Sequence, residues 1–143
     1  MFFIVAFLVF LADLIFKRLA VAYLAPAGSL PVINGVMSLT YVQNTGVAFG
    51  FLRGHRPLLI LIGVLVCLVV AYFDQRLGKE DRFFKFCLAM ILGGSLGNLS
   101  DRIFLGYVVD YIDFRVFPVF NFADMAINSG VFLIFYKMFF NKS

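Results

Sequence analysis

Histidine, cysteine and charged side chains are scarce in this sequence, and each scarcity excludes a class of protein. The single histidine, His55, cannot form a histidine cluster, so we expect no zinc or haem site. Cys67 and Cys87 lie within apolar stretches and are not spaced as CxxC, which indicates buried small hydrophobic side chains rather than a disulfide framework or a metal site. The net charge of +4 is too small to suggest nucleic acid as a partner. We therefore expect no metal and no cofactor.

Apolar residues are correspondingly abundant. They make up 63% of the chain, charged residues 14%, and the mean hydropathy is +1.00, far from the usual soluble composition of about 45–50% apolar and about 25% charged. Because a helix that crosses a bilayer needs about 20 apolar residues, we predict an all-α membrane protein with four transmembrane helices in a single domain, residues 1–143. The helices are expected over residues 1–24, 57–73, 83–104 and 119–140.

The first apolar stretch has an alternative interpretation as a cleaved signal peptide, with residues 2–12 as its hydrophobic part. No basic flank precedes it, and Asp13, Lys17 and Arg18 stand where a cleavage site of small residues would be. We therefore expect a retained transmembrane helix, although the missing basic flank provides little information on its orientation.

The loops set the expected orientation. Residues 74–82, DQRLGKEDR, carry Arg76, Lys79 and Arg82, so the positive-inside rule makes this loop cytoplasmic. With four spans, both termini then also face the cytoplasm. The bias is small, because arginines also occur in the segments that would face outward.

Residues 26–56 form the one sizeable segment that we expect outside the membrane. Asn34-Gly35 between β-prone runs predicts a β-hairpin with a type I′ turn, whose two central positions need positive φ. We expect a small sheet on the outer membrane surface. The stretch QNTGVAFGF at its end, with Asn44, Gly46 and Gly50, indicates a segment that turns back into the interface, and an ordinary amphipathic loop is the alternative.

Polar side chains recur at helical spacing within three of the four helices. An Asp or Arg at a helix centre costs about 2.5–3.5 kcal/mol on insertion scales, so such residues usually face the bundle interior. The stripes are Asp13 and Lys17 on the first helix, Asn98, Asp101 and Arg102 at the end of the third, and Asn121, Asp124 and Asn128 at the start of the fourth. Topology brings all three towards the same outer half of the membrane, as a functional site or a buried structural network.

Two pairs of opposite charge have a structural explanation. Asp13 with Lys17, and Asp101 with Arg102, are expected to be compensating charges that hold helices together. Asp113 is expected to be interfacial and solvated.

Asp110 and Asp124 have no cation beside them in the sequence, which argues against simple pairing. When two carboxyl groups lie close together, one is held protonated while the other stays charged, and such a pair can hydrolyse an amide. No Ser-His or Cys-His arrangement competes with this chemistry. The pair would form if the turn around Phe117-Pro118 folds the fourth helix back against the end of the third.

Two other classes of function would also explain parts of this pattern. A small ion-coupled transporter uses intramembrane acids, but no inverted repeat is visible and the acids cluster near one membrane face. A structural assembly subunit explains the stripes but not the unpaired Asp110 and Asp124. Asn44, Asn98 and Asn121 could each bridge backbone groups or bind a substrate, and the residues alone leave both roles open.

Five blocks of sequence in the same order resemble the bacterial lipoprotein signal peptidases, the type II signal peptidase family. They are DLIFK at 13–17, NTGVAFGF at 44–51, GNLSDR at 97–102, VVDYIDF at 108–114 and FNFAD at 120–124. The family consists of four-helix aspartyl proteases of the inner membrane. The resemblance implies catalytic roles for Asp110 and Asp124, a substrate-binding role for Asn44, Gly46, Asn98, Arg102 and Asn121, and a supporting role for Asp13, Lys17 and Asp101.

The resemblance also implies a substrate. It would be a prolipoprotein whose cysteine carries a diacylglyceryl group, with cleavage just before that cysteine. The expected partners are the lipid-modified signal peptide and membrane lipid, the expected state is a monomer, and the site should lie near the outer face. The hairpin and residues 44–51 would correspond to the family's extramembrane cradle and its mobile element. The missing basic flank at the N-terminus departs from the family's pattern.

Overall fold

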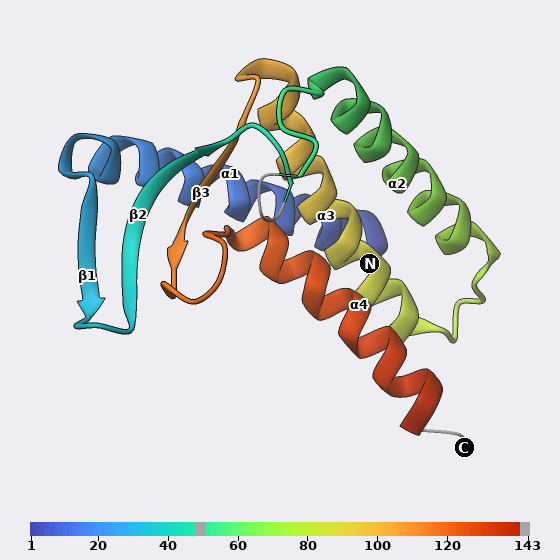
Figure 1. The fold of residues 1–143 in the computed structure, drawn as a ribbon. Helices are drawn as coiled ribbons and strands as arrows, with labels where there is room; N and C mark the ends of the chain where they lie inside the picture. The colour runs from blue at the N-terminus through green and yellow to red at the C-terminus, as the bar shows by residue number, and fades with distance from the viewer. Residues whose placement is uncertain (48–50, 141–143) are drawn as a thin grey trace.

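The structure, a computed structural model, describes residues 1–47 and 51–140 as four helices and a three-stranded sheet (Figure 1). In chain order the elements are α1 (Phe2–Ala27), β1 (Ser29–Ile33), β2 (Met37–Asn44), α2 (Arg56–Arg76), α3 (Arg82–Phe104), β3 (Val108–Asp113) and α4 (Phe122–Phe140). Each helix lies within three residues of its predicted bounds.

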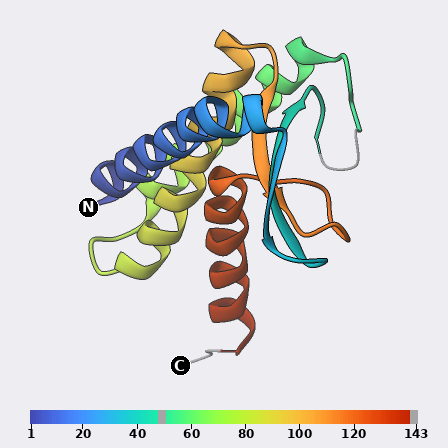
Figure 2. The ribbon, with the colours of Figure 1, turned by 90° about the vertical axis from the view of Figure 1, so that its left-hand side faces the viewer.

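Helix α3 is the centre of the bundle and packs against the other three helices (Figures 1 and 2). Glycines make these approaches close. A Cβ added at Gly93 would lie 2.5 Å from the carbonyl oxygen of Ala6 in α1, and one at Gly94 would lie 2.5 Å from that of Ala123 in α4. Small residues let helix backbones approach closely where lipid supplies little hydrophobic driving force between helices.

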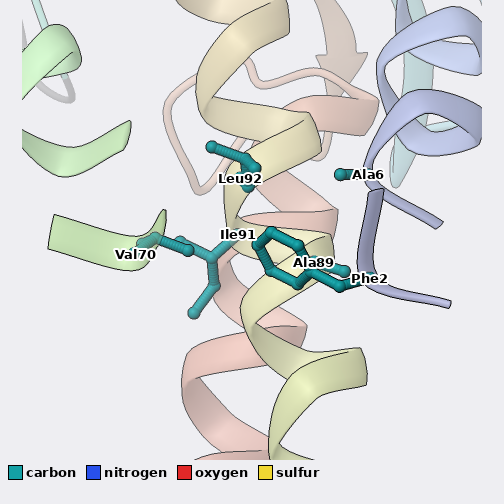
Figure 3. Packing of buried hydrophobic residues seen from close by; sticks show 6 residues of the cluster. All are labelled: Phe2, Ala6, Val70, Ala89, Ile91 and Leu92. Atoms are coloured by element: carbon teal, nitrogen blue, oxygen red, sulfur yellow. The ribbon is translucent and has the colours of Figure 1, made fainter. Parts of the chain in front are cut away.

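At one end of the bundle, apolar side chains from three helices pack together. Figure 3 shows Phe2 and Ala6 of α1 and Val70 of α2 converging on the α3 side chains. The buried cluster consists of Phe2, Ala6, Val70, Ala89, Ile91 and Leu92. Cys87 is fully buried on the same helix and Cys67 packs beside the cluster, so both cysteines lie in apolar surroundings as predicted.

Three helices of the described chain, α2, α3 and α4, are long and apolar enough to cross a membrane. Helix α1 is the longest, at 26 residues, but Asp13, Lys17 and Arg18 lie within it. Two of these charged residues, Asp13 and Lys17, are buried inside the bundle, where they are 0% and 3% exposed. The described structure thus supports three of the four predicted spans by length and composition.

The predicted hairpin is confirmed, but its predicted turn type is wrong. β1 and β2 pair antiparallel, and the loop between them has three residues, because Ile33 pairs with Met37. Gly35 has a φ of 78°, whereas Asn34 has no positive φ, so the two positive values of a type I′ turn are absent at these residues. The register shifts between Pro31 and Ile33, where proline has no N–H to donate to the ladder.

Strand β3 was not predicted, although four of the six residues of VVDYID are β-branched or aromatic. It follows α3 after a turn at Gly106, whose φ is 85°. β3 pairs antiparallel with β2 and places Val108 opposite Asn44 and Asp110 opposite Val42. This pairing brings the hairpin to the end of α3.

Candidate active site

A cavity of about 620 Å³ lies between the sheet, the end of α3 and the start of α4. Asp110 reaches it from β3 and Asp124 from the first turn of α4. The polar side chains that line it are Asn44, Asn98, Arg102, Asp110, Asp124, Asn128 and Ser129. The predicted fold-back of the fourth helix is therefore confirmed, and it brings the two aspartates to one cavity.

Asp110 is held by neutral amides. Its side chain is 2% exposed, and its carboxyl oxygens accept hydrogen bonds from Asn44 Nδ2 at 2.9 Å and Asn121 Nδ2 at 2.7 Å. Burial, together with the negative charge of Asp124, raises the pKa of Asp110 to about 7, and the two amide hydrogen bonds oppose this rise only in part. Asp110 can therefore carry or release a proton near neutral pH.

Asp124 is oriented by a capping box at the start of α4. The Asp124 N–H donates to Asn121 Oδ1 at 2.9 Å, and the Asn121 N–H donates to Asp124 Oδ2 at 3.2 Å. In addition, Asp124 Oδ1 accepts a hydrogen bond from Asn98 Nδ2 at 2.8 Å. The box makes Asn121 the cap of α4, which explains why the helix begins at Phe122 and not at the predicted residue 119.

Side chains from α1 and β3 complete this helix start. The Phe122 N–H donates to Tyr111 Oη at 3.2 Å, and the Ala123 N–H donates to Asp13 Oδ1 at 3.0 Å. The first N–H groups of a helix have no intrahelical partner, so these contacts satisfy groups that would otherwise be unpaired. Asp13 thus supports the turn that carries Asp124.

Lys17 connects the buried acids behind the cavity. Its Nζ lies 2.7 Å from Asp13 Oδ2 and 3.1 Å from Asp101 Oδ2, and it donates to Asn98 Oδ1 at 2.9 Å. The predicted pairing of Asp13 with Lys17 is confirmed. Because Lys17 binds the amide oxygen of Asn98, the amide nitrogen of Asn98 is left to face Asp124.

The predicted pair of Asp101 with Arg102 is wrong. Asp101 binds Lys17 and accepts the Val109 N–H at 3.0 Å, and no ion pair joins Asp101 to Arg102 in the described structure. Consecutive helix residues point about 100° apart, so the two side chains face different neighbours. Arg102 lines the cavity and donates from Nη2 to the carbonyl oxygen of Gly46 at 3.2 Å, while its Nε has no hydrogen-bond partner among the described residues.

Gly46 orients Asn44. Its N–H donates to Asn44 Oδ1 at 2.9 Å, which directs Asn44 Nδ2 to Asp110. A Cβ at Gly46 would lie 2.6 Å from the carbonyl oxygen of Phe51, so the turn needs glycine. The interface segment predicted around these residues includes Phe49 and Gly50, which lie outside the described residues.

Reasoning from the sequence missed three contributors. Tyr111 caps α4, and the alternation of β3 places it on the opposite face from Asp110, a pattern that could have drawn attention to it. Val109 contributes backbone groups to Asp101 and Asn121, for which side-chain chemistry gives no signal. Arg56 donates to the Arg102 and Ile103 carbonyls at 2.8 Å each and so closes the end of α3.

The chemistry of the cavity follows from its donors. It contains two carboxyl groups, one of which has a pKa near neutrality. Its described lining has no cysteine that could act as a nucleophile and no histidine that could act as a base for one. Such a pair can activate water while polarising a carbonyl oxygen.

The fold and the site together define the class: a membrane enzyme of the aspartic peptidase type. A family model described as Signal peptidase (SPase) II matches residues 5–140. The chain therefore belongs to the signal peptidase II family.

Individual relatives and solved structures agree with this assignment. A lipoprotein signal peptidase of Caldanaerobacter subterraneus subsp. tengcongensis is 51% identical over 96% of this chain and 94% of its own length. One of Halothermothrix orenii is 44% identical over 94% and 92%. Two solved structures, both described as bacterial membrane enzymes, have TM-scores of 0.85 and 0.86 at 30% and 28% identity. They cover 98% and 97% of this chain, and the matches span 90% and 92% of those chains.

Proposed function

We propose that this protein removes the signal peptide from diacylglyceryl-modified prolipoproteins by hydrolysing the bond just before the lipidated cysteine. Membership of the signal peptidase II family supports the reaction. The observation that carries the proposal is that Asp110 and Asp124 come from different elements to one cavity, where each is held by neutral amides. No metal is required for this chemistry.

The roles of the two acids follow from their surroundings. Asp110, with its raised pKa, enters the reaction protonated and donates to the carbonyl oxygen of the scissile bond. Asp124 takes a proton from water, whose oxygen bonds to the carbonyl carbon. The tetrahedral intermediate then breaks its C–N bond, Asp124 returns a proton to the leaving nitrogen, and Asp110 recovers its proton as the carboxyl product forms.

The other predicted site residues divide into two groups. Asn44, Asn98 and Arg102 line the cavity, so we assign these residues to the substrate. Asn121 is 0% exposed and Gly46 acts through Asn44, so we assign both to positioning.

We further propose that all four helices span the membrane as a single domain, that both termini are cytoplasmic, and that the protein acts as a monomer. The cavity and the sheet then lie near the outer face. The support is that the charges of Asp13 and Lys17 are enclosed by the bundle, while other α1 side chains such as Phe3 and Phe7 are 72% and 58% exposed, as expected for a surface in contact with lipid.

The lipid on the substrate acts by position more than by affinity. Burial of hydrocarbon contributes about 0.8 kcal/mol per CH₂, but a precursor already in the bilayer keeps its acyl chains in hydrocarbon whether or not it is bound. Fixing the depth of the modified cysteine places the preceding bond beside Asp110 and Asp124. Apolar residues of the cavity wall, Phe117, Val119 and Met125, can contact such chains.

The test compares diacylglyceryl-modified and unmodified forms of one precursor with the purified protein in vesicles. Binding and cleavage are measured separately. We expect the modified form to be cleaved and the unmodified form to bind without turnover. Equal cleavage of both forms would show that the lipid does not position the bond and would favour a general intramembrane peptidase.

A further inference from the structure

Two loops meet at the end of the sheet that lies farthest from α1. One is the hairpin loop, residues 34–36, and the other is the segment 114–117 between β3 and α4. Strand pairing places Ser38 opposite Asp113, and Arg115 Nη2 lies 3.3 Å from Ser38 Oγ, to which it donates. Figures 1 and 2 both show the two tips next to each other.

The side chains at these tips are apolar and exposed. Val116 is 89% exposed and Phe117 68%, and three hairpin side chains are each more than half exposed. The six residues of this surface, named here the tip patch, are Val32, Ile33, Val36, Phe114, Val116 and Phe117. Scattered single apolar residues are ordinary on a protein surface, but several exposed apolar side chains gathered at two neighbouring tips indicate an interaction site.

The backbone at Arg115 presents this patch at an energetic cost. Arg115 has a φ of 64°, a left-handed conformation that is unfavourable for a residue other than glycine. Its N–H donates to Asp113 Oδ1 at 2.7 Å and its guanidinium binds Ser38, so both ends of the residue are held. The loop therefore has a fixed shape with Val116 turned outward.

The tip patch is continuous with surfaces that face lipid. Phe117 also lines the catalytic cavity, whose wall continues through Val119 to Met125 on α4, which is 47% exposed. In both views the two tips lie lower in the picture than the first turn of α4, and in Figure 2, where α4 runs straight down, they lie beside its upper half (Figures 1 and 2). The patch thus points towards the level of a membrane-spanning helix and not away from it.

We propose that the tip patch inserts into the bilayer, at the boundary between head groups and acyl chains of the leaflet that borders the catalytic cavity. Asp113 and Arg115 form its polar rim among the head groups. This rests on the proposed function for the identity of that leaflet as the outer one. The insertion fixes the depth of the sheet, and with it the depth of Asp110 on β3. It also gives acyl chains an apolar path along Phe117 to the cavity.

The chain contains no tryptophan, so single tryptophans report on chosen positions without background. Val36→Trp and Val116→Trp report on the two tips, and neither replaces a residue of the cavity lining. Ser29→Trp, at the opposite end of the hairpin, is the matched control, and Val69→Trp, 52% exposed on α2, is the reference within the membrane. Each folded variant is reconstituted in phosphatidylcholine vesicles with or without bromine on the acyl chains.

We expect both tip reporters to lose emission in brominated vesicles, most strongly where bromine lies near the head-group end of the chain, and to emit at shorter wavelength than Ser29→Trp. Ser29→Trp should be unaffected by bromine. Quenching of the tips no greater than that of Ser29→Trp would overturn the proposal. A blue-shifted tip emission without bromine quenching would overturn it too, and would indicate cover by protein. If Val36→Trp does not fold, Ile33→Trp takes its place.

This measurement uses no substrate, so it is independent of the proposed reaction. Loss of precursor cleavage with normal quenching would contradict the proposed function alone. Quenching that fails in an enzyme that cleaves the modified precursor would contradict the membrane insertion alone.

Discussion

Four aspartates lie close together in this protein, and they are held in two different ways. Asp13 and Asp101 share the ammonium group of Lys17. Asp110 and Asp124 instead accept hydrogen bonds from asparagine amides. A cation strongly favours the charged form of an adjacent carboxyl group, whereas a neutral amide donor favours it less, so that the protonated form stays accessible. The first pair is therefore suited to holding helices together and the second to moving protons.

Asn98 joins the two pairs. Its amide oxygen accepts from Lys17 at 2.9 Å, and its amide nitrogen donates to Asp124 at 2.8 Å. The contact with Lys17 thereby sets which end of the Asn98 amide faces the cavity. Substitutions of the cavity aspartates should therefore mainly reduce turnover, whereas substitution of Lys17 should mainly reduce stability.

The largest expected effect on turnover comes from the amide-held pair. Asp110→Asn and Asp124→Asn should each reduce cleavage of the modified precursor by about 10³-fold or more, because the swap preserves shape but removes a proton site. Both variants should insert and fold. Cleavage assays on purified protein check the loss, and near-normal turnover by either variant would exclude that residue from the pair.

The largest expected effect on stability comes from the cation-held pair. Lys17→Met leaves two carboxyl groups without their shared cation in the bundle interior and should lower the free energy of unfolding by about 3–5 kcal/mol. Lys85→Met is the matched control, because Lys85 pairs with Asp74 at 3.0 Å but retains 19% exposure. The control should lose less than Lys17→Met, because Lys85 pairs with a single carboxyl group and keeps more contact with solvent. Denaturant unfolding in detergent compares them, and equal losses would contradict the distinction.

A smaller effect should appear in the pH dependence. Asp110 must be protonated to act as the acid, so kcat/KM should fall as the pH rises through about 7, the pKa of Asp110. The hydrogen bond from Asn44 favours the charged form, so Asn44→Ala should raise this pKa further and move the alkaline limb to higher pH. A limb that moves to lower pH would show that Asn44 does not act on Asp110 in this way.

No effect on the cleavage rate is expected from groups outside both pairs. Cys67→Ala, Cys87→Ala, thiol alkylation and chelators should leave cleavage of the modified precursor unchanged, because neither cysteine lies at the cavity and the paired carboxyl groups need no metal. Inactivation by EDTA that zinc restores would contradict the mechanism based on two aspartates.

Local patterns predicted the parts of this protein that depend on local forces. Runs of apolar residues marked the helices to within three residues, and an i,i+4 spacing was sufficient to pair Asp13 with Lys17. The same local reasoning failed for Asp101, whose partner lies on α1 and not at the next position in the chain. It also failed for β3, a short strand whose stability depends on pairing with β2.

The sequence by itself determined the membrane as solvent, the helices, the hairpin and the residues from which a site could be built, because composition and periodicity are properties of a single segment. Only the tertiary structure decided which side chains meet. Asn121 caps its own helix and also binds Asp110, and Asp13 caps a helix start 110 residues away. Such contacts arise because buried polar groups must find partners wherever the packing of glycines on α3 brings the backbones together.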